Sequence, residues 1–462
     1  MNRLLSEDNR AQLAFGIMAI LLLSVGYGQS WSLALTILNL CLISAVMSLG
    51  VNIQWGYAGL LNLGVMGFTS LGGLAAVLVS EAPVLEAWAV GGQGMVTSFV
   101  LVVITIVLAI LVYRSVAPGR PRQIALSVLF IGAYFVINSF YGPAVQAIEG
   151  VNPASQGFLG GMGLPIVFSW ILGGILAAGV AWIIGKITLG LRSDYLAIAT
   201  LGISEIIIAV LKNEDWLARG VKNVVGMDPA PVPEPIELQN SPWFIDMISN
   251  LFSGRLSVLT DTEYQKALND LVIQSSSIFV KLCFTGLFLV ILVVVLWLSI
   301  RALNSPWGRM MRSIRDNEEA ANAMGKNVVK QHLQVFILGS AVVGIAGAML
   351  VTLDGQFTPT SYQPLRFTFL VWLMVIVGGS GNNLGAVFGG FFIWFMWIEA
   401  EPASIVFMDL VTSGMDESNS LREHLLKSAP HLRLAIMGFV LLFTMRFMPK
   451  GIIPEKTRLH SV

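Results

Sequence analysis

Residues 277–300 read SIFVKLCFTGLFLVILVVVLWLSI, and this run decides the fold class of the chain. It carries a single charge, Lys281, and it has the length of about 17–25 residues that crosses roughly 30 Å of hydrocarbon. Similar runs recur, since 55% of the 462 residues are hydrophobic and only 12% are charged, against about 25% charged residues in soluble domains. The sequence therefore predicts an all-α, polytopic transmembrane helical bundle that forms a single domain over residues 1–462.

We expect about 10–12 membrane segments. The first is interpreted as a membrane helix and not a signal peptide, because no small-residue cleavage site follows it. The apolar stretch 367–400 is broken at Gly378–Asn383, and it forms either a tight hairpin or a re-entrant pair of half-helices. The other expected spans are 11–28, 31–51, 57–80, 95–113, 123–141, 165–185, 194–212, 277–300, 332–353 and 432–448.

Lysine and arginine set the expected orientation, because cytoplasmic segments carry an excess of both. The segments expected inside are 114–122, 186–192, 301–331 and 446–458. The loop 213–275, where acids outnumber bases, is expected on the outer face with an extended proline-rich part at 229–235 and a short helix around 261–273. A second outer insert is 401–431. The count of spans requires 367–400 to enter and leave the membrane on the same side.

Several function classes find no support in the composition. Net charge is zero and no basic face is visible, so nucleic-acid binding is not expected. Cys41 and Cys283 lie inside apolar runs and are interpreted as small buried side chains without a disulfide. No histidine stands at metal-ligand spacing. The glycine-rich stretch 378–385 lacks the Lys-Ser/Thr of a phosphate loop, and no catalytic motif indicates an enzyme.

The charged segment 305–325 interrupts an otherwise apolar chain. Its apolar residues fall near helical spacing, with charges between them. One interpretation is a surface helix among lipid headgroups, and the one we favour is a coupling helix that fits a groove on a cytoplasmic partner. The residues expected to make that contact are Arg309, Arg315, Asp316, Glu318, Glu319, Ala320, Ala321 and Gly325.

Several motifs, in order along the chain, resemble the branched-chain amino acid permease family of ABC importers, the LivM-like subunit. Residues 318–325, EEAANAMG, look like the EAA-type signature of importer permeases. The other matching motifs are WGYAGLLNLG at 55–64, YLAIATL at 195–201 with SEI at 204–206, GIAGA at 344–348, VGG at 377–379 and MRFMPKG at 445–451. The chain is long for this family, and the extra length lies in 81–95, 213–275 and 401–431.

The resemblance implies a permease subunit in the bacterial inner membrane. Its implied partners are a second, related permease, two cytoplasmic ABC ATPases that bind ATP and Mg, and a periplasmic solute-binding protein. No cofactor is implied on this chain. The implied solute is a branched-chain amino acid, with urea or a short amide as the close alternative. A stand-alone channel or secondary transporter is the alternative from another class.

A solute path is expected among polar and glycine residues inside the spans. Tyr57 and Asn62 lie in the early glycine-rich segment, and Gly378 and Gly379 lie at the late break. Glu205 stands near the middle of 194–212, where an ionisable residue is costly and faces protein or water. It either lines the path or forms a structural hydrogen bond to a neighbouring helix, while each glycine either opens the backbone or serves helix packing.

Overall fold

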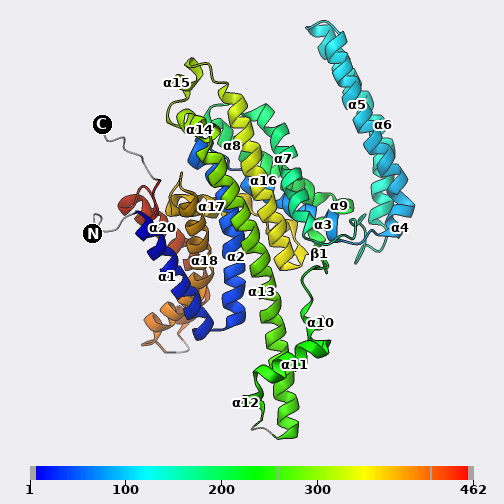
Figure 1. Cartoon of the computed structure of the whole chain (residues 1–462). Helices are drawn as coiled ribbons and strands as arrows, with labels where there is room; N and C mark the ends of the chain where they lie inside the picture. Colours follow the sequence, from blue (N-terminus) through cyan, green and yellow to red (C-terminus); the bar gives the residue numbers. More distant parts are fainter. Residues whose placement is uncertain (1–6, 258–259, 417–418, 456–462) are drawn as a thin grey trace, which may run out of the picture.

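The computed structural model of the protein describes residues 7–257, 260–416 and 419–455. Within these residues the chain is almost entirely helical (Figure 1). The end of one predicted basic segment, 456–458, lies outside the described part. The N-terminal half contains α1 Glu7–Gly28, α2 Trp31–Val51, η1 Asn52–Gly56, α3 Val65–Ser80, α4 Leu85–Ala87, η2 Trp88–Gly92, α5 Gln93–Ser115, α6 Arg120–Glu149, α7 Phe168–Thr188, α8 Ser193–Asn213, α9 Asp215–Ala218, η3 Gly220–Lys222 and β1 Val224–Val225.

The C-terminal half continues with the same helical character. Its single strand, β2, pairs antiparallel with β1. Its elements are α10 Pro235–Asn240, α11 Pro242–Leu251, α12 Ser253–Leu256, α13 Asp261–Asn304, α14 Pro306–Asp316, α15 Glu318–Ala323, α16 Val328–Asp354, β2 Gln356–Phe357, η4 Pro359–Ser361, α17 Pro364–Gly378, α18 Asn383–Thr412, α19 Ser420–Ser428, η5 Ala429–His431 and α20 Leu432–Phe447.

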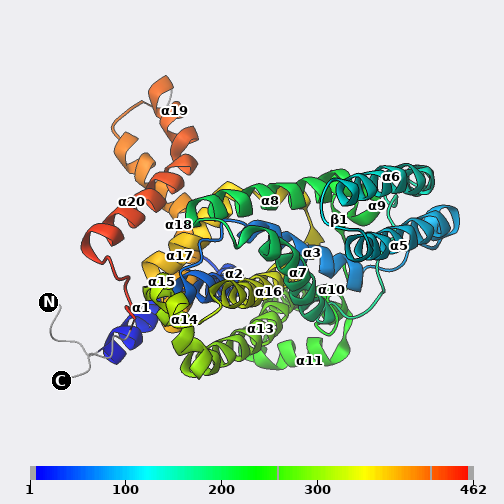
Figure 2. The ribbon, with the colours of Figure 1, turned by 90° about the horizontal axis from the view of Figure 1, so that it is seen from above.

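The predicted fold class is confirmed. In the described residues, 10 helices are long and apolar enough to cross a membrane, and α3 and α17 are shorter apolar helices. With α3 and α17 included, the described residues contain 12 apolar helices, which is the upper end of the predicted 10–12 membrane segments. Figure 2 shows the bundle as elongated, with the α5–α6 pair at one end and α19–α20 at the other.

Close contacts between small residues hold the centre of the bundle, where α16 packs against α2, α3 and α7. A β-carbon on Gly72 of α3 would overlap the carbonyl oxygen of Gly344 of α16. A β-carbon on Gly389 of α18 would overlap the carbonyl oxygen of Met374 of α17. Because lipid gives no hydrophobic drive between helices, such close backbone packing is what holds them together.

The predicted span 57–80 is wrong at its start. Helix α2 continues through the π-helical turn η1, and residues 59–64 then run without helix until α3 begins at Val65. Gly64 lies beside the backbone of Thr200, near the middle of α8, so α3 begins at the depth of the centre of that helix. The physical reason is local: the Asn62 side chain accepts a hydrogen bond from the Gly64 N–H at 2.8 Å, which replaces a helical bond.

The broken stretch 367–400 is a hairpin of α17 and α18. Helix α18 lies antiparallel to α2, because Ser48 donates to the Ala386 carbonyl near one end and Gln29 donates to Glu399 near the other. The turn between α17 and α18 therefore lies at the end of the bundle where α2 ends. Both outer ends of the hairpin lie on the opposite side, as the count of spans requires. The predicted loop 401–431 is wrong in part, since α18 continues to Thr412 and α19 follows.

The predicted loop 213–275 is also partly helical. It contains α9 to α12, and the short helix expected around 261–273 is the first part of α13, a single helix of 44 residues. A capping box between Thr260 and Glu263 starts it. At 1.5 Å per residue α13 is about 66 Å long, so it exceeds the roughly 30 Å hydrocarbon layer. Its first half projects from the bundle beside α10 to α12 (Figure 1).

The described basic segments gather at one end of the bundle. Helices α14 and α15 lie there, at the top of Figure 1, together with the turn between α5 and α6. The end of α7 joins them, because Gly185 packs against Leu333 near the start of α16. Helices α10 to α12 lie at the opposite end, which is the arrangement that lysine and arginine predict for the inner and outer faces. Cys41 and Cys283 are both free; Cys41 is buried, and Cys283 is only half-buried, contrary to the prediction.

Candidate functional site

The charged segment forms two short helices that meet at Asn317. The Asn317 side chain accepts a hydrogen bond from the Ala320 N–H at 2.9 Å and so caps α15. Helix α14 is fixed to the bundle, since Trp307 donates to Gln334 of α16 at 3.0 Å and Arg312 donates to the Leu303 carbonyl at 2.8 Å. The segment is therefore held at its base, which presents α15 outward.

Helix α15 is exposed except for one residue. Glu318, Glu319 and Ala320 are exposed, whereas Ala321 is buried against the chain. Met324 is 81% exposed at the tip, which is unusual for a large apolar side chain. Gly325 follows with φ +78° and open space around it, a conformation that glycine adopts without strain. This gives a small, acidic surface with an apolar tip, the kind of surface that a partner groove accepts.

Arg315 does not share this exposed surface. Its guanidinium donates to the Gly56 carbonyl at the end of η1 and to Glu455 at 3.0 Å, and it pairs with Asp316 at 3.1 Å. Burial works against the charged form, but Glu455 and Asp316 together raise the pKa of Arg315 above its ordinary value, so the ion pair stays charged. Arg315 therefore attaches the charged segment to the bundle and to the C-terminal segment, and Arg309 is the exposed arginine.

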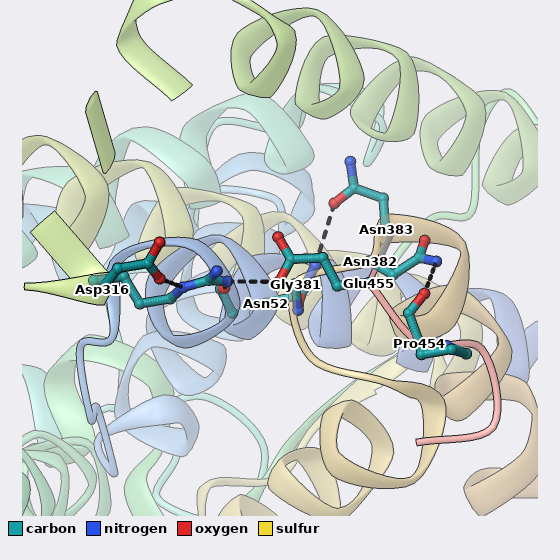
Figure 3. A network of polar contacts seen from close by, with 9 residues as sticks. Asn52, Asp316, Gly381, Asn382, Asn383, Pro454 and Glu455 are labelled. Carbon is teal, nitrogen blue, oxygen red and sulfur yellow. Dashed lines mark hydrogen bonds and ion pairs between the residues drawn. The ribbon is translucent and has the colours of Figure 1, made fainter. Parts of the chain in front are cut away.

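A polar network surrounds this attachment (Figure 3). Asn52 accepts a hydrogen bond from the Gly381 N–H at 2.9 Å and donates to Asn383 at 3.2 Å. Asn382 donates to the Pro454 carbonyl at 2.9 Å. The network thus ties α2, the turn between α17 and α18, and the chain end at 452–455 into one assembly beside α14.

Four residues predicted for the solute path occupy different environments. Tyr57 is buried and lines a pocket of about 380 Å³ beside Arg312 and Glu455. Asn62 donates to Gln54 at 2.9 Å, and its carbonyl accepts from Trp372 at 3.0 Å, so it fixes the break before α3. Gly378 and Gly379 pack against Gly385 and Ile453, which is the packing role that the sequence left open.

Glu205 lies on the surface of α8 and lines an open pocket of about 950 Å³ with residues of α17, α18 and α20. Within the described residues, its carboxylate has no hydrogen bond or ion pair. In the described part of the chain, Glu205 therefore does not form the structural hydrogen bond to a neighbouring helix that the sequence left open. The geometry leaves this carboxylate free to meet a solute or a partner chain.

Comparison with known proteins identifies the family. The model of the family described as "Branched-chain amino acid transport system / permease component" matches residues 144–445. The chain belongs to this family. The matched part of the permease contains α7, α8 and α13 to α18, and therefore the whole charged segment and Glu205.

Curated relatives agree with this assignment. A "Probable branched-chain amino acid transport permease protein LivM" of Methanocaldococcus jannaschii is 23% identical over 354 residues, which are 76% of this permease and 84% of that protein. The LivM proteins of Salmonella typhimurium and Escherichia coli are each 27% identical over 220 residues, 47% of this chain and 46% of theirs. The permease thus spans about half the length of these two. No solved structure matches.

Three residues of the permease's two main polar sites were missed by sequence reasoning. Glu455 lies far from Arg315 in the chain, and only the fold brings the two side chains together. Arg366 and Arg433 share the pocket with Glu205. No signal in the sequence marked Arg366, since an arginine just before an apolar stretch is also expected where a side chain only reaches the headgroup region.

Proposed function

We propose that this chain is the permease subunit of an ATP-driven importer. In the proposed assembly a second, related permease lies beside it, and two cytoplasmic ABC ATPases bind and hydrolyse ATP with Mg. A periplasmic solute-binding protein delivers the solute at the outer face of the inner membrane. The family supports the transport role, and the ATPase and binding-protein partners are the proposed part.

One observation carries the proposal: α15 is an exposed, acidic helix with an apolar tip at the end of the bundle that carries the basic segments. A helix that served only to join α14 to α16 would not need Met324 in water. An ATPase groove that accepts α15 would bury Met324 and pair with Glu318 and Glu319. Because α14 is tied to η1 through Arg315, movement of the ATPases would reach α2 directly, and rigid-body rocking of the helices would follow.

For the solute, we propose a branched-chain amino acid, since the family and the LivM relatives carry that description. Urea or a short amide is the close alternative. A match of 27% over 109 residues to the "Fructose import permease protein FrcC" of Rhizobium meliloti indicates that related permeases serve chemically different solutes.

The test replaces residues of α15 and measures docking. Glu318→Lys with Glu319→Lys reverses the charge of the exposed surface, and Gly325→Val forces a β-branched residue to φ +78°, at a cost of roughly 1–3 kcal/mol. We expect both variants to reach the membrane in normal amount, but to lose co-purification with the ATPases and to lose uptake.

A matched control is Asp246→Lys, which introduces a cation at an exposed position of α11, at the opposite end of the bundle. It should leave docking and uptake unchanged. Normal co-purification and full uptake by the α15 variants would refute the docking role.

A further inference from the structure

The pocket lined by Glu205 contains charged and apolar side chains to which the docking of the ATPases gives no role. It has a volume of about 950 Å³ and lies between α8, α17, α18 and α20, which are neighbours in the bundle (Figure 2). Small-molecule sites have volumes of about 300–1,000 Å³, so this pocket is large enough to hold a small solute. Charges of both signs line it, as well as an apolar surface.

The negative side of the pocket is Glu205. It lies near the middle of α8, a helix of 21 residues that is long and apolar enough to span the membrane. An ionisable residue at this depth faces water, a solute or another chain, because hydrocarbon does not solvate it. Its carboxylate has no partner among the described residues, so the fold leaves one negative charge unsatisfied in the pocket.

The positive side is formed by two arginines at Trp397 and by Lys212 of α8. The guanidinium carbons of Arg366 and Arg433 lie 4.8 Å and 4.2 Å from the centre of the Trp397 ring. Arg433 is already paired with Glu401 at 3.0 Å. Arg366 has no ion pair in the described part of the chain, and its Nε is buried without a hydrogen bond. Arg366 is therefore the arginine that is free to bind an anion. Lys212 is a second unpaired cation among the described residues, but it lies about two turns from Glu205 along the same helix, so Arg366 is the free cation that a different helix contributes to the pocket.

Between the charges the wall is apolar. Leu370 and Met437 are buried beneath it, whereas Phe369 and Leu434 are 46% and 54% exposed on its surface. A solute that matches all three features carries an ammonium, a carboxylate and an apolar side chain.

We propose that this pocket is one wall of the solute path and binds a zwitterionic amino acid with an apolar side chain. Glu205 receives the ammonium, Arg366 receives the carboxylate, and the apolar wall contacts the side chain. This inference rests on the proposed function and deepens it. It favours amino acids over urea and short amides, because a neutral solute would leave both charges without a partner.

The test uses the full transporter in proteoliposomes, with L-leucine as the solute. The variants are Glu205→Gln and Arg366→Gln, with Asp194→Asn as the matched control, an exposed acid at the start of the same helix outside the pocket. The solute-binding protein is unchanged, so its affinity for leucine is the same in every preparation. Uptake and ATP hydrolysis are measured together.

We expect each pocket variant to lower leucine uptake about tenfold or more, because each removes roughly one hydrogen bond to a charged group of the solute. ATP hydrolysis and ATPase co-purification should stay within about twofold, and Glu205→Asp should recover part of the uptake. A transporter whose native form fails to couple ATP to uptake would instead refute the proposed function itself.

Two results would overturn the inference. The first is leucine uptake within about twofold of the native level in both pocket variants. The second is normal uptake with loss of bound phosphatidylethanolamine, whose headgroup carries the same pair of charges. That outcome would assign the pocket to a lipid.

Discussion

The ion pair between Arg315 and Glu455 allows a quantitative prediction. Both side chains are 25% exposed, and the pair joins α14 to the chain end. An exposed ion pair contributes about 0–1 kcal/mol, whereas a hydrogen bond to a charged group contributes about 1.5–3 kcal/mol. Arg315→Ala removes the charged hydrogen bond that Arg315 donates to Glu455 at 3.0 Å. The bond to the Gly56 carbonyl is also lost, but it holds α14 to η1 and not to the chain end. We expect the attachment of the chain end to weaken by about 2 kcal/mol, roughly 30-fold in its opening equilibrium.

Two amides report this opening. The Ile452 and Ile453 N–H groups donate to the carbonyls of Val377 and Gly378, each at 2.9 Å. Hydrogen exchange of the peptide that contains them should accelerate about 30-fold in Arg315→Ala. Glu455→Gln keeps an acceptor but removes the charge, so we expect a smaller effect of about 1 kcal/mol, roughly fivefold.

The matched control is Arg309→Ala on the same helix. Among the described residues, exposed Arg309 donates only to the Asn304 carbonyl, at 3.3 Å. Exchange at 452–453 should therefore stay at the native rate. Unchanged exchange in Arg315→Ala would mean that the backbone bonds alone hold the chain end, and that the ion pair contributes nothing to it.

Three further predictions concern topology, packing and pH. In a variant without native cysteines, a cysteine at 320 should react only with reagent on the inner face, and one at 237 only with reagent on the outer face; outer labelling at 320 would reverse the orientation. Gly72→Leu should abolish folded yield in size-exclusion chromatography, since the side chain would meet the Gly344 carbonyl, whereas Gly179→Leu, with open space around it, should fold normally. Burial raises the pKa of the Glu81 carboxyl, with Arg219 opposing it. At pH values above the ordinary pKa of 4.5, the folded state therefore holds more protons than the unfolded state. The free energy of unfolding should for this reason rise as the pH falls from about 7 towards 4.5. Glu81→Gln removes the titrating group, so it should flatten this dependence of Tm on pH.

Hydrophobic run length was enough to predict most of the spans, because a helix is the one element that satisfies its own backbone in lipid. The break at residues 59–64 was not predictable in this way, since the run is as apolar as the helices beside it. The signal lies in Asn62, whose side chain replaces a helical hydrogen bond. The length of helix α13 was underestimated because its first part is polar. Hydropathy detects only the part of a helix that lies in the membrane.

The candidate sites were predictable to different degrees. The exposed surface of α15 follows from charge and spacing in one segment, and the structure places Glu318, Glu319 and Gly325 on it. The partners of Arg315 and Glu205 depend on contacts between segments far apart in the chain. Arg315 was grouped with the exposed residues because its helix is charged, although its guanidinium is bound to Gly56 and Glu455.

We propose that ATP hydrolysis on partner subunits drives transport through this permease. The most direct measurement is leucine accumulation in proteoliposomes that contain the permease, its partner permease, the two ATPases and the solute-binding protein. We predict accumulation only when ATP and Mg are supplied on the ATPase side, with no effect of ionophores that collapse ion gradients. Accumulation by the permease alone, driven by an ion gradient without ATP, would show that it is a secondary transporter and not a subunit of an ATP-driven importer.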